Sequence, residues 1–599
     1  MVAFVRALPV RSRQLALLRL AGRPIVVGLV LVFAIQAALP AAGAIAVGAL
    51  VGRLVGLTAG HGPSVARAVP AVLALGGLIL LGHFAEHADD LLRFAAQRRI
   101  DGAVRGRARA AAMAGPGIGR LEDSRVRDDL AAAVDGWLGQ TAGNGAVGQL
   151  WLVFRFLGAF VAAAVLARYS VPLALTLLVA MTVLRAMLRR QWLGLMAAAM
   201  SERQNMRRAD YWADIAAGPE AAKEVRVFGF GPWAVRRQQE QALATLRQVR
   251  GRLHGVLRRQ PLVFALTAAA CLASLVVPVT EALRGRLDAG QLATYLRASV
   301  GVLALGAMGA EAYAIQFSRP AVEAIDRLAV STTAVAAPAA VPATARPPVI
   351  RFDGVGFAYP GFDRPLLSGL DLTIPGGQVL AVVGANGAGK TTLIKLLAGL
   401  YQPDTGRITA DGVDVATLDP DAWRSRLAVV FQDFIHYELS TRDNIALGAP
   451  ERRADDATVT AAMARAGAGT LLAELPAGLD TILSRAYSGG TELSGGQWQR
   501  VAVARALFAV LGGRRVLVLD EPTAHLDARA ELAVFDGIIE AVRGVTLILI
   551  SHRFATVRRA DRIVVLDEGR VRETGSHDEL MCANGYYADM FTRQAERFR

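Results

Sequence analysis

The sequence predicts a two-part fold: a membrane domain of six transmembrane α-helices, followed by an α/β domain with a phosphate-binding loop. Three observations indicate this. Six apolar stretches fill the first half of the 599-residue chain. Hydrophobic residues make up 53% of it, which is high for a water-soluble protein. A glycine-rich segment matching G-x-x-x-x-G-K-[ST] follows an apolar run in the second half. We expect a transmembrane domain at residues 1–330 and an α/β domain at residues 349–599.

The six apolar stretches are rich in Ala, Val and Leu, and each is near the roughly 20 residues that cross a bilayer. They are residues 25–51, 68–85, 142–167, 171–188, 261–280 and 292–317. Six such stretches in series argue against the alternative, a soluble bundle of buried helices. The first is too long for the apolar region of a cleavable signal peptide, so we expect none.

The arginines predict the orientation of these spans. Many lie before the first span, between the second and third, and between the fourth and fifth, whereas the alternate loops 52–67, 168–170 and 281–291 are short and poor in charge. Loops that are rich in lysine and arginine tend to stay on the cytoplasmic side of the membrane. The N-terminus and the α/β domain are therefore expected on the cytoplasmic side of a cell membrane. The net charge of +15 is explained by this topology, and no nucleic-acid partner is expected.

The glycine-rich segment is expected to bind the phosphates of a nucleotide, because it lies between an apolar strand-like run and a helix-like run. Backbone N–H groups and the helix N-terminus favour negative charge. Lys390 would reach the β- and γ-phosphates, and the Thr391 hydroxyl would ligate Mg²⁺. The expected nucleotide-binding residues of this loop are Gly384, Asn386, Gly387, Ala388, Gly389, Lys390, Thr391 and Thr392.

A second segment, VLVLDE at residues 516–521, predicts a buried parallel strand that ends in two carboxylates. Ligands of open α/β sheets bind at the carboxyl ends of the strands. Asp520 is placed to hold Mg²⁺ through water, and Glu521 to polarise the attacking water. Together with the loop, this strand predicts hydrolysis of ATP or GTP.

Between the two lies LSGGQ, residues 493–497, and here the chain resembles the ATP-binding cassette (ABC) ATPases. The resemblance implies that ATP and Mg²⁺ bind, and that the signature residues Ser494, Gly495, Gly496 and Gln497 face the γ-phosphate held by a second cassette. It gives Tyr359 the role of stacking on adenine, Gln432 that of sensing Mg²⁺, and His552 that of contacting the γ-phosphate. Residues 524–527, AHLD, resemble the loop that crosses the dimer.

Two of these roles have simpler alternatives. An aromatic residue near a strand end, such as Tyr359, also serves as ordinary packing. A single histidine is often a satisfied surface residue, but the apolar run at residues 546–550 delivers His552 to the family's position. We therefore expect Glu521, His552 and Gln432 to form the catalytic group, with Thr391, Gln432 and Asp520 around the metal.

The membrane half resembles that of exporter-type ABC half-transporters. Residues 119–130 and 209–230 resemble the two cytoplasmic coupling elements, although amphipathic surface helices are the alternative. The Ala/Pro-rich residues 331–348 are expected to form an extended linker. The signature loop needs a second cassette, so a dimer is implied. A homodimer is favoured because every catalytic element is present, and a heterodimer remains open.

The cassette resembles those of bacterial peptide and multidrug exporters at residues 431–448 and 489–508, and departs from many exporters at residues 484–492. This favours export of a peptide-like or amphipathic compound across a bacterial inner membrane by alternating access. No leader-peptidase domain is expected before residue 25. An importer of siderophore type, a lipid flippase and a non-transport ABC ATPase are the alternatives.

Some ionisable residues lie in or near the spans, where they either line a substrate path or lie at the membrane–water interface. They are His83, Glu86, His87, Arg155, Arg297 and Glu311.

Overall fold

The computed structural model describes residues 10–58, 68–115, 117–136, 139–201, 203–258, 260–330, 346–452, 455–522 and 528–596. The chain forms two compact units. The first comprises Met1–Met113 and Arg125–Ser331, and the second Ala114–Ser124 and Thr332–Arg599. Most of the expected linker, residues 331–345, and the expected dimer-crossing loop, residues 524–527, lie outside the described residues.

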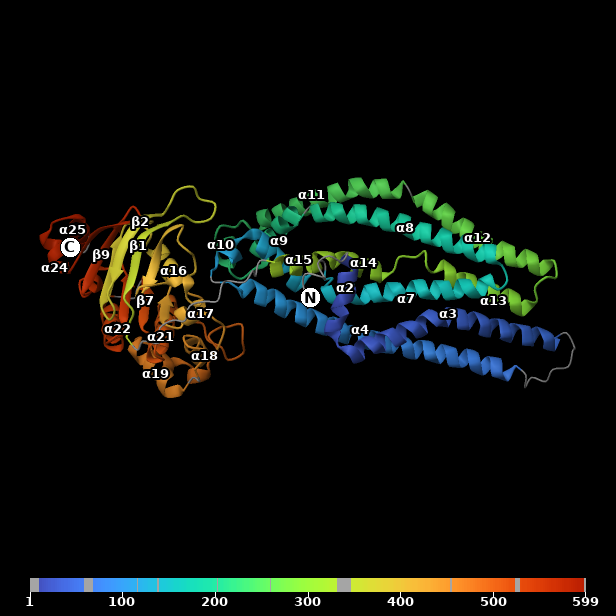
Figure 1. Ribbon diagram of the computed structural model, residues 1–599, viewed down its shortest axis with the longest axis horizontal. Coiled ribbons are helices and arrows are strands. Elements are labelled where there is room, and N and C mark those ends of the chain that lie inside the picture. Colours follow the sequence, from blue (N-terminus) through green and yellow to red (C-terminus); the bar gives the residue numbers. More distant parts are fainter. Residues whose placement is uncertain are drawn as a thin grey trace. The chain divides into compact units, whose positions relative to one another are not determined.

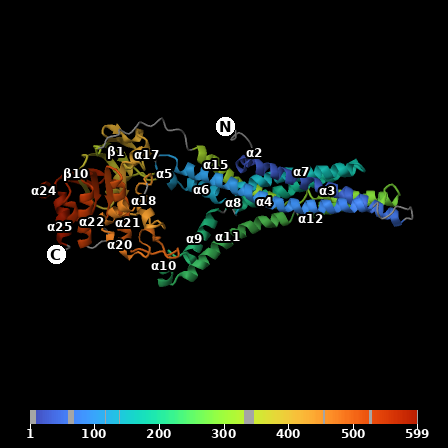
Figure 2. The same ribbon diagram turned by 90° about the horizontal axis from the view of Figure 1, so that it is seen from below.

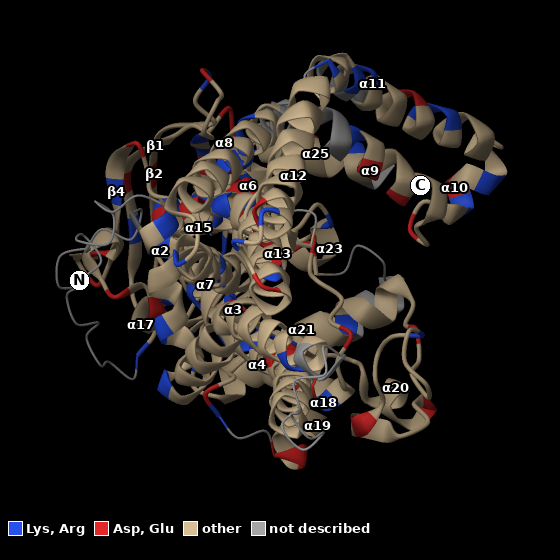
Figure 3. Ribbon diagram, turned by 90° about the vertical axis from the view of Figure 1, so that its right-hand side faces the viewer, with Lys and Arg blue, Asp and Glu red and all other residues tan. Residues whose placement is uncertain are grey.

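The first unit is helical (Figure 1). Its elements are α2 (Val10–Ala16), η1 (Leu17–Ala21), α3 (Arg23–Thr58), α4 (Val69–Met113), α6 (Ser124–Asp135), α7 (Ala142–Ala167), α8 (Val171–Ser201), α9 (Arg203–Ala217), α10 (Ala222–Val227), α11 (Gly231–Leu257), α12 (Gln260–Leu283), α13 (Ala289–Leu303), α14 (Ala310–Phe317) and α15 (Arg319–Val330). Two views show α11 and α12 following one another beside α8 and α9 (Figures 1 and 2). Basic residues colour the ribbons of α9, α10 and α11 (Figure 3), as the predicted basic connection requires.

Five described helices are long and apolar enough to cross a membrane: Arg23–Val55, Val69–Met113, Ala142–Ala167, Val171–Gly194 and His254–Leu283. The sixth predicted span is not one helix, because it divides into α13 and α14 with residues 304–309 between them. Arg155 donates hydrogen bonds to the carbonyls of Ala304 and Ala307, both at 2.7 Å. Arg185 donates to the carbonyls of Leu305 and Ala307, at 3.2 and 2.8 Å. These guanidinium groups satisfy backbone carbonyls that a continuous helix would bond internally.

Close helix packing in this unit rests on small residues. The helix α3 packs against α4, α7 and α13. A Cβ at Gly48 would lie 2.6 Å from the carbonyl oxygen of Gly290, and one at Gly158 would lie 2.9 Å from that of Ala37. Small residues allow backbones to approach where apolar burial alone does not drive association.

The second unit contains two sheets. A four-stranded antiparallel sheet has the order β2-β1-β4-β5 and a six-stranded sheet the order β10-β9-β3-β8-β7-β6. The strands are β1 (Ile350–Phe357), β2 (Leu367–Ile374), β3 (Val379–Gly384), β4 (Thr405–Ala410), β5 (Val413–Asp414), β6 (Leu427–Val430), β7 (Val516–Asp520), β8 (Thr546–Ile550), β9 (Arg562–Asp567) and β10 (Arg570–Gly575). The pairs β3–β8, β3–β9, β6–β7 and β7–β8 are parallel, and β9–β10 is antiparallel.

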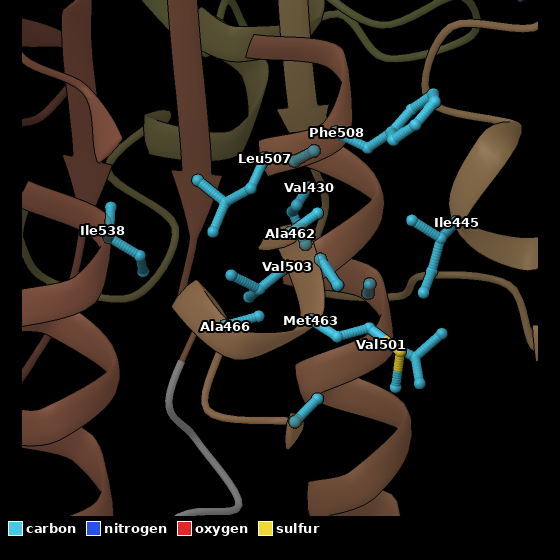
Figure 4. Packing of buried hydrophobic residues seen from close by; sticks show 14 of the residues in the cluster. Val430, Ile445, Ala462, Met463, Ala466, Val501, Val503, Leu507, Phe508 and Ile538 are labelled. Carbon is cyan, nitrogen blue, oxygen red and sulfur yellow. The ribbon is translucent and has the colours of Figure 1, made fainter. Parts of the chain in front are cut away.

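Helices surround these strands. They are α5 (Gly119–Glu122), α16 (Lys390–Leu397), η3 (Val415–Thr417), α17 (Pro420–Arg424), α18 (Thr441–Ala446), α19 (Asp456–Arg465), α20 (Gly469–Glu474), η4 (Gly478–Asp480), α21 (Gly495–Leu511), α22 (Ala528–Ala541), α23 (Phe554–Val557), α24 (His577–Cys582) and α25 (Tyr586–Glu596). Figure 4 shows side chains of α21, such as Val503 and Leu507, packed with Ala462 and Met463 of α19. Buried β3, β7 and β8 form the centre of the core.

Candidate nucleotide site

The six-stranded sheet brings the phosphate loop and the two carboxylates to one edge. The strand β8 pairs with β3 on one side and with β7 on the other, all in parallel. Asp520 is aligned with Ile550 at the ends of β7 and β8. Because carboxyl ends of parallel strands meet at one edge, the segments after β3, β6, β7 and β8 converge there.

The phosphate loop has the backbone that its glycines predict. Gly384, Gly387 and Gly389 have φ values of 154°, 82° and 98°, which side chains larger than hydrogen rarely adopt. A Cβ at Gly384 would lie 2.2 Å from the carbonyl oxygen of Leu566. Asn386 and Gly387 are exposed, whereas Ala388 is buried. The loop thus exposes its central peptide groups to a ligand while both of its ends are packed.

Lys390 is the first residue of α16 and is 8% exposed. Its Nζ donates hydrogen bonds to the carbonyl oxygens of Gly384 and Ala385, both at 2.9 Å. Burial lowers the pKa of Lys390, while the nearby carboxylates Glu521 and Asp520 raise it. The ammonium therefore lies inside the loop, at the place from which it would reach the phosphates.

Thr391 and Asp520 form the next contact, with the Thr391 hydroxyl donating to the Asp520 carboxylate at 2.8 Å. Asp520 is 2% exposed. Burial raises its pKa and repulsion from Glu521 adds to this, whereas the Thr391 bond and Lys390 oppose it. A hydroxyl and a carboxylate are the oxygen ligands that Mg²⁺ prefers, so the pair fits this ion beside a nucleotide's phosphates.

Glu521 is held between two side chains that the sequence singled out. His552 Nε2 lies 3.1 Å from Glu521 Oε1, and Gln432 Nε2 donates to Glu521 Oε2 at 3.4 Å. Burial lowers the pKa of His552, as does Lys390, while Glu521 raises it. The three predicted catalytic residues therefore meet, although they follow three different strands: β6, β7 and β8.

The backbone of Glu521 is also fixed. Its φ is 50°, a left-handed value that is uncommon outside glycine. Its N–H donates to the carbonyl of Ile550 at 2.9 Å, and its own carbonyl accepts from Gln499 Nε2 at 2.9 Å. Sequence reasoning missed Gln499. Its only sequence signal is its position one turn inside the helix that the signature segment begins.

Tyr359 lies in an aromatic cluster with Phe357 and Tyr401, at ring-centroid distances of 5.1 and 5.3 Å. Its hydroxyl lies 3.1 Å from the hydroxyl oxygen of Thr392, in the first turn of α16. Lys395 Nζ lies 5.4 Å from the ring centroid. Tyr359 is thus packed beside the phosphate loop, and its stacking on adenine stays a prediction.

The signature residues begin α21. Ser494 is its N-cap: the Ser494 hydroxyl oxygen accepts from the Gln497 N–H at 3.3 Å, and the Gln497 side chain accepts from the Ser494 N–H at 2.8 Å. Gly495 and Gly496 form the first turn. This capping box fixes the helix start, and a helix N-terminus without bulky side chains suits an approaching phosphate.

The start of the predicted first coupling element, together with Ile118 just before it, contacts the segment that follows α16 within the second unit. Ile118 N–H donates to the Leu400 carbonyl at 2.9 Å, and the Tyr401 hydroxyl donates to the Glu122 carboxylate. Burial and the Glu122 carboxylate raise the pKa of Tyr401. Since Tyr401 also packs against Tyr359, this segment touches the aromatic cluster beside the phosphate loop.

Comparisons with known proteins show what this chain is similar to. Residues 367–524 match the family described as ABC transporter. The mycobactin import ATP-binding/permease protein IrtB of Mycolicibacterium thermoresistibile is 44% identical over 251 residues, 42% of each chain. An ATP-dependent lipid A-core flippase of Alkalilimnicola ehrlichii is 42% identical over 242 residues, 40% of each chain. The matches span about two fifths of the length of these curated relatives.

The solved structure of a bacterial Atm1-family ABC exporter with ATP bound has a similar fold. Its TM-score is 0.75 at 24% identity, over 96% of this chain and 99% of that one. This likeness confirms the predicted fold class, helical membrane domain followed by cassette. The match to the ABC transporter family therefore covers residues 367–524, and the chain as a whole has the fold of this exporter.

Proposed function

We propose that this chain hydrolyses ATP to move an amphipathic or peptide-like compound across a bacterial inner membrane by alternating access. The single observation that carries the proposal is the position of Glu521, which His552 and Gln432 contact at the sheet edge where Thr391 and Asp520 meet. Apolar helices in the first unit supply the membrane path. The division into residues 1–330, 331–348 and 349–599 is part of this proposal.

Each site residue has a defined task in the proposed hydrolysis. Lys390 and the loop N–H groups hold the β- and γ-phosphates. Glu521 accepts hydrogen bonding from the attacking water and orients it, and His552, neutral because burial lowers its pKa, contacts the γ-phosphate. A Mg²⁺ held by Thr391, Gln432 and, through water, Asp520 would neutralise charge on the phosphates.

Assembly as a dimer follows from the signature residues. Ser494 and Gln497 bond to each other at the start of α21, so the helix N-terminus is preformed for an anion from a second cassette. We propose a homodimer, since Lys390, Asp520, Glu521, Ser494 and His552 are all present in this chain. Expression of the chain alone tests this. A monomer without ATPase activity that a second polypeptide rescues would contradict it.

Import is a second candidate direction, and one observation favours it. A relative that is 44% identical over 251 residues is named for mycobactin import. A relative named as a lipid A-core flippase, 42% identical over 242 residues, keeps lipid movement as a third candidate. Export remains our proposal because the cassette segments at residues 431–448 and 489–508 resemble those of peptide and multidrug exporters.

Transport into vesicles of known orientation distinguishes the directions. In inverted membrane vesicles the cassettes face the added ATP, so an exporter loads the lumen with a labelled amphipathic compound and an importer releases preloaded compound. The matched control is the Lys390→Ala chain, which should do neither. The proposal would be contradicted if the parent chain had no ATPase activity. It would also be contradicted if the chain hydrolysed ATP without moving a peptide, an amphiphile, a siderophore or a headgroup-labelled lipid.

A further inference from the structure

A small cavity in the helical unit lies among α2, α7, α8 and α14. Its volume is about 170 Å³, below the range of about 300–1,000 Å³ that holds a drug-sized ligand. Three arginines line it: Arg11 from α2, and Arg185 and Arg189 from α8. A cavity of this size and lining suits one charged group of a larger molecule.

The charge around this cavity is not balanced by the side chains that line it. The lining contains three arginines and no aspartate or glutamate. Arg185, 9% exposed, bonds to Glu311 at 3.1 Å. The same Glu311 oxygen also accepts from Arg155 at 2.8 Å. One carboxylate therefore serves two guanidinium groups, and Arg11 and Arg189 add further positive charge.

The arginines also act on one another. Burial lowers the pKa of the Arg11 guanidinium, and the positive charges of Arg189, Arg319 and Arg185 lower it further. Of the three arginines, Arg185 is buried, and Arg11 and Arg189 are exposed, so solvent screens part of their repulsion. A bound anion would relieve this repulsion.

The rest of the wall suits an amphiphile. Trp192 Nε1 is buried and has no hydrogen-bond partner among the described residues, although its ring packs on Tyr313 at 4.6 Å. Because this nitrogen is sealed from solvent, Trp192 lines the cavity with its other atoms. The apolar lining comprises Leu152, Phe156, Leu193, Met308, Ala312 and Ile315.

The cavity lies where the membrane helices become basic. Arg185 and Arg189 stand in the second half of the apolar segment Val171–Gly194, and Arg11 precedes the span that begins at Arg23. Under the proposed topology this is the cytoplasmic side of the bilayer. The interrupted helix supplies part of the wall, because Met308 lies in the break and Ala312 lies in the first turn of α14.

We infer that this cavity binds the phosphate or carboxylate head of an amphiphilic molecule, with Arg11 and Arg189 as donors. The inference rests on the proposed function and narrows its substrate class to anionic amphiphiles. Two sources share this chemistry: a transported compound and an anionic lipid resident in the inner leaflet. Guanidinium groups are donors without acceptors, so the site discriminates against cationic heads.

Binding is measured on the full chain in phosphatidylcholine nanodiscs without ATP, using fluorescent dodecyl phosphate as the probe. Arg11→Ala and Arg189→Ala should each weaken binding about tenfold, the loss expected for one charge-assisted hydrogen bond. Trp192→Phe should change it little, because the indole N–H is sealed from solvent. Arg190→Ala is the matched control, because Arg190 adjoins Arg189 but does not line the cavity. Arg185 is left unchanged because it holds the break in the sixth span.

A second arm separates the two sources. If the site takes transported compound, dodecyl phosphate stimulates ATP hydrolysis in the parent chain and not in Arg189→Ala. If the site takes a resident lipid, phosphatidylglycerol in the nanodiscs raises the melting temperature of the parent chain and competes with the probe for binding. The Arg189→Ala chain loses both effects. Equal probe affinity in Arg11→Ala, Arg189→Ala and Arg190→Ala, or equal affinity for a cationic dodecyl amine, would overturn the inference. Binding is read without ATP, so a failure of transport leaves this test intact.

Discussion

Replacing Glu521 with Gln separates nucleotide binding from hydrolysis. The change removes one negative charge from the carboxylate that His552 contacts at 3.1 Å and Gln432 at 3.4 Å. It leaves the backbone bonds of residue 521 to Ile550 and Gln499 in place, so the local fold should persist. A positioned general base contributes about 10²–10⁴-fold to rate, and phosphate release at saturating Mg-ATP should fall by that factor.

Nucleotide affinity should survive the Glu521→Gln change, because Lys390, Thr391 and the loop N–H groups hold the phosphates. The ATP-bound dimer should then accumulate, with the cassettes closed. The assay combines phosphate release with a spin-label distance between the two cassettes. Glu568→Gln is the matched control, since Glu568 is exposed and also has a positive φ, 44°. Hydrolysis at the parental rate, or cassettes that stay apart in saturating ATP, would refute the role of Glu521.

Three further predictions concern adenine, pH and the interrupted span. Tyr359→Ala should weaken ATP binding by about 1–3 kcal/mol, the scale of base–aromatic stacking, with less effect on turnover at saturation; unchanged affinity in a titration would mean that another residue holds the base. Because burial lowers the pKa of His552 below its usual 6.5, its neutral form persists through pH 6.5, and the rate should fall only at more acid pH; a midpoint above 6.5 that disappears in His552→Gln would contradict this. Glu311→Gln should destabilise the membrane unit by about 3–5 kcal/mol, since it leaves the buried guanidinium of Arg185 and the half-buried one of Arg155 without their carboxylate. It should lower the thermal midpoint far more than the exposed-pair control Glu323→Gln.

Features that depend on local sequence were predicted well. The phosphate loop needs glycines at fixed positions, and Gly384, Gly387 and Gly389 have the positive φ values that such a loop requires. Asp520 and Glu521 end a strand whose residues are all buried. Each pattern consists of a few consecutive residues, so a single sequence is enough to recognise it.

The interruption of the sixth span could not be predicted in the same way. Its sequence is apolar and continuous in composition, and the interruption depends on Arg155 and Arg185 reaching carbonyls 120 to 152 residues away along the chain. The sequence identified Arg155 and Glu311 as ionisable residues in or near the spans. Their pairing, at 2.8 Å, required the tertiary structure. A hydropathy pattern counts charges and does not locate their partners.

The helix α21 joins two halves of the proposed cycle. Its first cap, Ser494, is the group that would meet the phosphate of a second cassette, and Gln499, five residues later, holds the carbonyl of Glu521 in its own cassette at 2.9 Å. Five residues span about 7.5 Å along a helix axis. Because α21 is packed against α19 and the sheet, we expect its two ends to move together. In the proposed dimer, a phosphate held by the second cassette that draws Ser494 toward it would therefore also act on the backbone of Glu521 in the same chain as Ser494. Gln499→Ala should leave ATP binding by a single cassette unchanged while lowering turnover of the dimer, because it cuts this connection without touching either nucleotide contact.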